Sequence, residues 1–155
     1  SKSFASLGGF IACDKTITNF LRHHSRSYIF TASITPASTA AASAALDIMM
    51  SEPERMENLW DITHYALDGF RNMGCEIGNT STPIIPLYIR DNNLTFMITK
   101  ELSDAGIFVN PVVSPAVAPH DTLIRFSLMA THTKEQVTIA LETIQKIFKK
   151  YNLIP

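Results

Sequence analysis

The chain has 155 residues, which is long enough for one ordinary domain with a substantial core. Hydrophobic residues make up 46% and charged residues 17%, a balance that indicates a globular chain and excludes a disordered one. The 13 basic and 14 acidic residues leave a net charge of −1, so there is no basic excess to support nucleic-acid binding.

Cysteine content and hydropathy narrow the setting further. Cys13 and Cys75 form no disulfide framework and have no metal-ligand spacing, which favours a reducing, cytoplasmic setting and predicts no metal site. No apolar run reaches the length of a membrane span, so we expect no transmembrane segment. Because the chain has no initiator methionine, we expect it to be a piece of a longer protein.

The first fifty residues predict two short extended segments and two helices. Segment 8–13 is typical of a short buried strand, and segment 28–33 is rich in β-branched and aromatic residues. One helix is expected over 14–24. Another, over 37–50, follows Thr35-Pro36, since threonine is a good N-cap and proline suits a first turn. The small residues of this helix and the apolar ones at its end favour close packing, against other helices or across a subunit interface, over exposure.

From Ser51 onward, helices and strands alternate. Two capping boxes are expected, one at Ser51 with Glu54 and one at Thr133 with Gln136. In a capping box, the side chains of a serine or threonine and of a glutamate or glutamine three residues later each accept a hydrogen bond from the other residue's backbone amide. The apolar spacing predicts, in order, a helix ending at Gly74, a strand at 83–89, a helix at 91–105, a brief strand at 107–109, a proline-rich loop at 111–119, a strand at 122–129 and a final helix after Thr133.

Two sequence patterns in this part make more specific predictions. Pro86 lies inside the strand at 83–89, which is therefore expected at a sheet edge or a bulge, because proline has no N–H to donate. In the helix at 91–105, the inward-facing residues are expected to be Leu94, Met97, Ile98, Leu102 and Ala105.

The two parts of the chain therefore differ in character. Residues 1–50 have the pattern of the C-terminal tail of a larger domain, whereas residues 51–155 predict a small C-terminal α+β domain. In that domain we expect a short, partly antiparallel sheet covered by helices on one face.

Lys2 is the first residue that could carry covalent chemistry. It lies between Ser1 and Ser3 and ahead of a glycine pair at 8–9, in a setting of small residues and hydroxyls. A lysine that forms a Schiff base needs an uncharged amine close to a carbonyl group, and serine hydroxyls can contact a phosphate. The alternative is a solvated lysine in a polar turn, which these residues by themselves favour.

Arg125 is the second candidate. The alternation of segment 123–128 places Ile124 and Phe126 on one face of a strand and Arg125 on the other. An arginine in the middle of a strand, away from the core, can form two parallel hydrogen bonds with a carboxylate. A structural ion pair with an aspartate or glutamate fits the pattern equally well.

The histidines show no catalytic pattern. His132, just before the expected capping threonine, favours a local hydrogen bond over acid–base catalysis. His23 and His24 are adjacent and would point in different directions on a helix, so they suit its C-terminal end better than a metal site.

Four segments, in register and in order, resemble the C-terminal part of the α-oxoamine synthases, which are pyridoxal 5'-phosphate (PLP)-dependent enzymes of aminotransferase fold type I. The segments are SKSFASLGGFIA at 1–12, YIFTASITPA at 28–37, GIFVNPVVSPAV at 106–117 and LIRFSLMATHT at 123–133. The serine before the lysine and the SFASLGG that follows it are most similar to the bacterial serine palmitoyltransferase branch, whereas other branches more often have glycine before that lysine.

The resemblance implies a role for five residues. Lys2 would hold PLP as a Schiff base and shuttle the α-proton of the substrate, and Ser1 would contact the cofactor phosphate. Thr31 and the Ala32 amide would reach the phosphate of the other subunit's PLP, so the active site would be shared within a homodimer. Arg125 would bind the carboxylate of the amino-acid substrate.

The reaction that the resemblance implies is a decarboxylative condensation of an amino acid, with L-serine as the best match, and a long-chain acyl-CoA. Segment 111–119 would be a mobile segment over the substrates. Two other members of the family, 8-amino-7-oxononanoate synthase and 2-amino-3-ketobutyrate CoA ligase, are the alternatives within it. The alternative of another class is a non-catalytic α+β module that dimerises through the alanine-rich helix.

The chain also departs from the family pattern. In the family, the residues that hold the cofactor ring precede the lysine, so this chain would supply half an active site and is expected to be inactive by itself. Cys13 stands where the family commonly has glycine, and SPAV at 114–117 replaces a PPATP-like loop.

Overall fold

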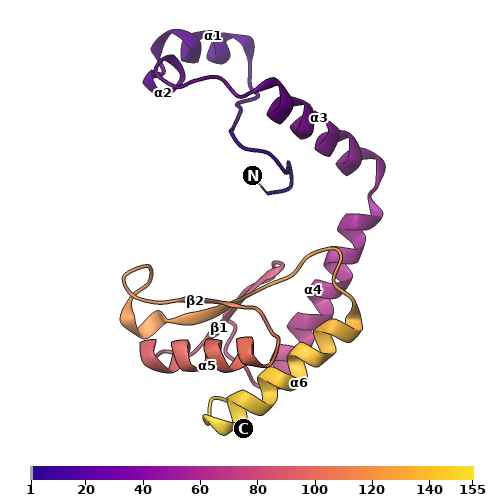
Figure 1. The fold of residues 1–155 in the computed structure, drawn as a ribbon, viewed down its shortest axis with the longest axis vertical. Helices are drawn as coiled ribbons and strands as arrows, with labels where there is room; N and C mark the ends of the chain where they lie inside the picture. The colour runs from indigo at the N-terminus through magenta and orange to yellow at the C-terminus, as the bar shows by residue number, and fades with distance from the viewer. Residues whose placement is uncertain (1) are drawn as a thin grey trace. The chain divides into compact units, whose positions relative to one another are not determined.

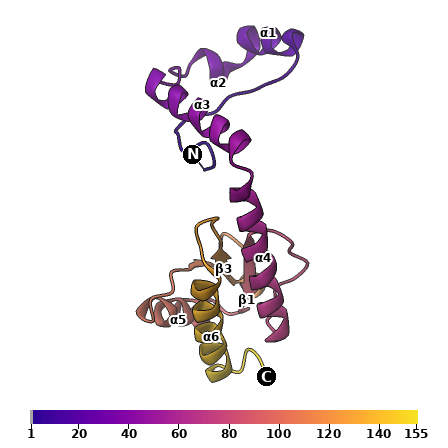
Figure 2. The ribbon, with the colours of Figure 1, turned by 90° about the vertical axis from the view of Figure 1, so that its right-hand side faces the viewer.

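The structure is a computed structural model that describes residues 2–155. The chain divides into two compact units, Ser1–Pro53 and Glu54–Pro155, which we call the N-terminal unit and the C-terminal unit. In Figures 1 and 2, helices α1 to α3 belong to the N-terminal unit, and all of the labelled strands belong to the C-terminal unit.

The N-terminal unit contains three helices, α1 (Lys15–His24), α2 (Arg26–Ile29) and α3 (Pro36–Ser51). The two expected extended segments are wrong: 8–13 is irregular and 28–33 begins inside α2. A strand needs a partner for its backbone groups, and no residue from 2 to 53 lies in a sheet. The Ser25 hydroxyl accepts a hydrogen bond from the Tyr28 amide, which begins a helical turn where an extended segment was predicted.

The ends of α3 match one prediction and contradict another. Thr35 is its N-cap, with the hydroxyl accepting from the Ser38 amide at 3.2 Å, and Pro36 lies in the first turn as predicted. Ser51 is not the N-cap expected for the following helix. It is the last residue of α3, and its hydroxyl donates to the Asp47 carbonyl oxygen at 2.8 Å.

No described residue of the N-terminal unit is buried. The apolar residues near the end of α3, for which packing was expected, are 42%, 39% and 76% exposed at Ile48, Met49 and Met50. Packing of this helix against other helices of the described chain is therefore not found, and packing across a subunit interface stays a prediction.

The C-terminal unit alternates helices and strands, as expected. Its elements are α4 (Glu54–Asn72), β1 (Ile84–Tyr88), α5 (Asn92–Asp104), β2 (Asn110–Val112), the 3₁₀ helix η1 (Pro119–Asp121), β3 (Leu123–Ser127) and α6 (Lys134–Lys150). The strands form one antiparallel sheet in the order β1-β3-β2. The α+β prediction is therefore confirmed, and Pro86 lies in an edge strand as expected.

One face of the sheet forms the core together with the three long helices. The side chains of Ile85, Leu87, Ile124 and Phe126 are buried and belong to a single hydrophobic cluster that includes residues of α4, α5 and α6. Phe70 of α4 meets Phe126 edge-on, with the ring centroids 5.1 Å apart. The alternation along β3 leaves the opposite face of the sheet open to solvent.

The helix ends and close contacts of this unit follow local chemistry. The Gln136 side chain accepts from the Thr133 amide at 3.0 Å and the Thr133 hydroxyl accepts from the Gln136 amide at 3.3 Å, so this capping box is confirmed. Gly74 follows α4 with a φ of +79°, a conformation that glycine adopts without strain. Gly69 faces Leu141, and a β-carbon there would lie 2.5 Å from a leucine methyl group, so the missing side chain lets α4 and α6 approach closely.

Two local expectations in this unit are wrong. Met97 is 55% exposed and Ala105 is also exposed, so the buried stripe of α5 is narrower than predicted and consists of Thr95, Ile98 and Leu102. The strand expected at 107–109 begins instead at Asn110. The Ile107 amide donates to the Leu102 carbonyl oxygen and thereby completes the end of α5.

Candidate functional site

Lys2 lies in a turn at the start of the described chain. Its carbonyl oxygen accepts from the Ala5 amide at 2.9 Å, and its side chain is exposed. Further along, the Ser6 hydroxyl donates to the Ser38 carbonyl oxygen at 2.8 Å, which fastens this segment to α3. Ser1, expected to contact a cofactor phosphate, lies outside the described residues.

Thr31 and Ala32 line an open cavity of about 940 Å³ within the N-terminal unit. Its walls come from segment 7–11, from α1 and α2, and from the residues that lead into α3. Arg22 adds a basic side chain to the wall. A hydroxyl, a backbone amide and a cation therefore adjoin one space, and Lys2 is not among the residues that line it.

Arg125 projects from the middle of β3 on the open face of the sheet, as predicted. Its Nε donates to the Ser127 hydroxyl at 3.1 Å. Within residues 2–155, Arg125 forms no ion pair, so the structural ion pair that the sequence left open is not made by the described part of the chain. A guanidinium with free Nη groups on a solvent-facing strand can receive a carboxylate.

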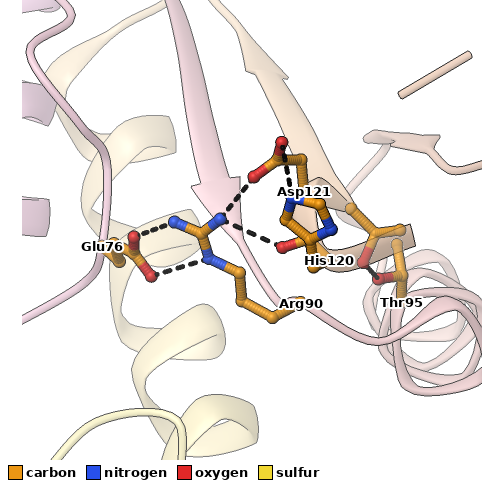
Figure 3. A network of polar contacts seen from close by, with 6 residues as sticks. Glu76, Arg90, Thr95, His120 and Asp121 are labelled. Atoms are coloured by element: carbon orange, nitrogen blue, oxygen red, sulfur yellow. Dashed lines mark hydrogen bonds and ion pairs between the residues drawn. The ribbon is translucent and has the colours of Figure 1, made fainter. Parts of the chain in front are cut away.

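A second arginine, Arg90, is the centre of a polar cluster that no sequence pattern indicated (Figure 3). Arg90 Nε donates to the Glu76 carboxylate at 3.2 Å, and Arg90 Nη2 donates to the same carboxylate. Arg90 Nη1 donates to Asp121 Oδ1 at 2.6 Å and to the His120 carbonyl oxygen at 3.0 Å. The Arg90 guanidinium also lies 4.5 Å from the centroid of the Tyr88 ring. These contacts raise the pKa of Arg90, chiefly through the hydrogen bond to Glu76.

This cluster joins segments that are distant in the sequence. Glu76 precedes β1, Arg90 follows it, and Asp121 ends η1 (Figure 3). The Arg90 amide also donates to the Thr122 carbonyl oxygen at 3.0 Å, and Arg90 has a φ of +69°, which is uncommon for a residue with a side chain. The contacts fix the chain where it enters β3, just ahead of Arg125. Partners 14 to 31 residues away leave no motif from which to predict them.

The loop expected at 111–119 is shorter in the structure, because β2 includes its first two residues. The Ser114 amide donates to the Asn92 side-chain oxygen at 3.4 Å, which links the loop to the start of α5. At its other end, the loop is held by the contacts of Arg90 with His120 and Asp121. Movement of this segment over a substrate stays a prediction.

Other potentially reactive groups have local roles. His132 accepts from the Met129 amide through Nδ1 at 3.2 Å, so its predicted local role is confirmed. Burial raises the pKa of the Cys75 thiol to about 11, which keeps it protonated and unreactive at neutral pH. Residues 2–155 contain no group of three or more His, Cys, Asp or Glu side chains placed to hold a metal, and none of their helices is long and apolar enough to cross a bilayer.

The predicted site residues thus fall into two sets. Thr31 and Ala32 line one cavity of the N-terminal unit. Lys2 belongs to the same unit but does not line that cavity, and Arg125 belongs to the C-terminal unit. The first set offers an amine and groups that can bind a phosphate. The second offers a guanidinium for a carboxylate.

Comparison with known proteins identifies the family. The family model for class I and II aminotransferases matches residues 1–144. The chain belongs to the aminotransferase class I and II family. A serine palmitoyltransferase of Bacteroides thetaiotaomicron is 59% identical over 154 residues, which are 99% of this chain and 39% of that protein. An 8-amino-7-oxononanoate synthase of Bacillus pumilus is 37% identical over 154 residues, with the same two shares covered.

Solved structures agree with this family assignment. A structure of SPT with a PLP internal aldimine superimposes with a TM-score of 0.90 at 30% identity. The aligned part comprises 99% of this chain and 39% of that chain. The serine palmitoyltransferase of Sphingomonas wittichii gives a TM-score of 0.90 at 29% identity, with the same coverage. The resemblance to this branch of the PLP-dependent enzymes is confirmed, and the chain spans about two fifths of the length of the relatives it matches.

Proposed function

We propose that the chain is part of a PLP-dependent acyltransferase that condenses L-serine with palmitoyl-CoA in sphingolipid biosynthesis. The serine α-carbon forms a bond to the acyl carbon, whose bond to sulfur breaks to release CoA. The serine carboxylate leaves as CO2, one proton is taken up, and the product is 3-ketodihydrosphingosine.

The observation that carries this proposal is the order of identities among the relatives. Serine palmitoyltransferases from two Bacteroides species and from Sphingobacterium spiritivorum are 59%, 58% and 54% identical to this chain. Another from Bacteriovorax stolpii is 39% identical, and the 8-amino-7-oxononanoate synthase of Bacillus pumilus is 37% identical. An 8-amino-7-oxononanoate synthase activity is therefore the second candidate.

The described residues suit PLP by their chemistry. Lys2 offers an exposed amine, and Thr31 and Ala32 offer a hydroxyl and a backbone amide at the wall of one cavity. Bound PLP supplies an electron sink for the bonds of the serine α-carbon. Lys2 would hold the cofactor covalently and move the α-proton, and Thr31 and Ala32 would bind the phosphate.

Arg125 would bind the serine carboxylate before it leaves. The two Nη groups can donate two parallel hydrogen bonds to a carboxylate, which fixes both its position and its plane. Fixing the carboxylate orients the bond that breaks, and orientation of this kind accounts for much of the acceleration that an enzyme can achieve.

We also propose a cytoplasmic homodimer in which Thr31 and Ala32 serve the cofactor of the partner subunit. The cavity that they line does not include Lys2, so the phosphate-binding groups and the amine can serve different cofactors. The N-terminal unit has no buried residue, which leaves apolar surface available for a partner. The free thiols of Cys13 and Cys75 support a reducing compartment.

The test is turnover by the complete protein that contains this chain. L-Serine, glycine and L-alanine are each supplied with palmitoyl-CoA and with acetyl-CoA, and CoA release and products are measured. We expect the highest kcat/KM for L-serine with palmitoyl-CoA. A preference for glycine with acetyl-CoA, or formation of 8-amino-7-oxononanoate, would replace this proposal with the corresponding activity. No CoA release from a folded dimer would favour the non-catalytic module.

A further inference from the structure

Three polar side chains gather on the open face of the small sheet. Arg125 and Ser127 alternate along β3 with the buried Ile124 and Phe126, so both point away from the core. Asn110 of β2 is paired directly with Arg125 in the antiparallel register. Directly paired residues project from the same face, and the side chains of all three polar residues are exposed.

Ser127 determines which donors of Arg125 remain available. Arg125 Nε donates to the Ser127 hydroxyl at 3.1 Å. The Nε–H group of the guanidinium is therefore already engaged within the chain. Nη1 and Nη2 have no partner among residues 2–155. A carboxylate is therefore directed to the end of the guanidinium, where these two nitrogens can each donate to one oxygen.

Asn110 places a further donor beside that end. Side chains of directly opposed residues have β-carbons about 4.5 to 5.5 Å apart, so the Asn110 amide is within reach of a ligand held by Arg125. The amide group can donate two hydrogen bonds, and its side chain has no hydrogen-bond partner within the described residues. The residue that flanks Arg125 from the other side is Pro86, which offers no polar side chain. Any additional side-chain donor from these paired strand positions must therefore come from β2.

We propose that Asn110 and Ser127 complete the carboxylate site of Arg125. Asn110 donates to one carboxylate oxygen of a free amino acid, and Ser127 is a positioning residue that holds the guanidinium end-on. This inference rests on the proposed function, because it takes Arg125 as the group that binds the substrate carboxylate. It adds a second binding residue from a different strand and defines the direction from which the carboxylate approaches.

The experiment compares variants in the complete protein, with separate measurement of KM for L-serine, KM for palmitoyl-CoA, kcat and thermal stability. Asn110→Ala should raise KM for L-serine about tenfold or more, since it removes a hydrogen bond to a charged group. Asn110→Asp should raise it at least as much, because the new carboxylate pairs with Arg125 and competes with the substrate. KM for palmitoyl-CoA and the melting temperature should stay close to those of the wild type.

Ser127 is tested in the same way. Ser127→Ala should raise KM for L-serine several-fold, whereas Ser127→Thr, which keeps the hydroxyl, should restore it. The matched controls are Asn93→Asp and Ser103→Ala, which alter exposed residues of α5 and should leave both KM values unchanged.

The outcomes separate the two proposals. If the wild-type protein turns over L-serine and both Asn110 variants keep its KM within about twofold, the inference about Asn110 is overturned while the proposed function stands. Equal increases in both KM values, with a lower melting temperature, would show a merely structural role and also overturn it. If the wild-type protein neither binds nor turns over an amino acid, the proposed function fails and the carboxylate site fails with it.

Discussion

The two units of this chain are stabilised in different ways. Every buried hydrophobic residue that the structure describes belongs to the C-terminal unit, from Ile62 to Ile154, whereas the N-terminal unit has none. Burial of apolar surface is the main favourable term in folding, so the C-terminal unit has its own source of stability. The helices of the N-terminal unit have helix hydrogen bonds, caps such as Thr35, and the Ser6 contact with α3.

This difference separates the two sets of candidate site residues. Arg125 lies on a sheet whose other face is packed into a core, so the fold of the C-terminal unit holds its backbone rigidly. Lys2 and Thr31 lie on segments without regular structure in a unit without buried residues. The group proposed to bind the carboxylate is thus preorganised by its own unit, whereas Lys2 is held by a local backbone hydrogen bond to Ala5.

The strongest test of this difference opens a cavity in the core. Phe70 is fully buried and meets Phe126 edge-on, so Phe70→Ala should lower the free energy of unfolding by about 3 to 5 kcal/mol. Denaturant titration followed by circular dichroism measures this loss. The matched control is Phe96→Ala on α5, where the ring is 53% exposed, and a loss of about 1 kcal/mol or less is expected. Equal losses for both variants would contradict the position of Phe70 in the core and of Phe96 at the surface of this unit.

A smaller effect is expected where α4 and α6 approach closely. Gly69→Ala adds a β-carbon 2.5 Å from Leu141, so it should destabilise by about 1 to 3 kcal/mol despite the better helix propensity of alanine. Gly9→Ala in the N-terminal unit is the comparison, because no atom other than those of its chain neighbours lies within 4 Å of the new carbon. The same titrations measure both variants. Stabilisation by Gly69→Ala would show that Leu141 moves aside freely.

A pH-dependent effect is expected at the contact between α5 and α6. The Lys150 ammonium lowers the pKa of Glu101 by its hydrogen bond, and the Tyr151 hydroxyl adds another. A carboxyl whose pKa is lowered by folding adds stability above its ordinary pKa and loses that contribution as the pH falls through its folded value. Glu101→Gln should therefore destabilise the unit at about pH 7 and have a smaller effect at about pH 3, below the ordinary pKa of a glutamate.

Unfolding titrations at both pH values measure this difference. Glu142→Gln on the exposed side of α6 is the matched control and should show no corresponding change between them. A loss of stability from Glu101→Gln that is as large at about pH 3 as at about pH 7 would assign its cause to packing instead of charge.

The smallest effect is expected from a substitution in the N-terminal unit. Phe20 of α1 is 58% exposed and stacks on His24, so Phe20→Ala should change the free energy of unfolding of the C-terminal unit by less than about 0.5 kcal/mol.

Hydrogen exchange of the unsubstituted chain compares the two units directly. Backbone amides of α3 should exchange faster than those of α4, because α4 contributes residues to the core and α3 has no buried residue. Equal protection of both helices would remove the difference between the units.

The sequence was sufficient wherever short-range chemistry decides the structure. The Thr133 capping box, the Thr35 N-cap and the outward position of Arg125 follow from residues at most four positions apart, and all were predicted correctly. The extended segments predicted at 8–13 and 28–33 are wrong, because a β-branched or glycine-led segment becomes a strand only when a partner strand is available.

Long-range contacts could not be predicted in the same way. The cluster around Arg90 depends on Glu76 and Asp121, which reach it only after the chain has folded. The pairing of Asn110 with Arg125 likewise needs the register of β2 against β3, and the strand predicted at 107–109 ended before Asn110. The family resemblance suggested roles for single residues, and the structure showed which residues lie beside them.

Both outer strands of the sheet contain a proline, Pro86 in β1 and Pro111 in β2, whereas the central strand β3 contains none. A proline interrupts the row of N–H donors that an edge strand would otherwise present to another chain. Neither edge can extend into a continuous sheet with a second molecule without losing a ladder hydrogen bond. Edge-to-edge pairing between copies is thereby disfavoured, and we expect the proposed homodimer to form through side-chain surfaces.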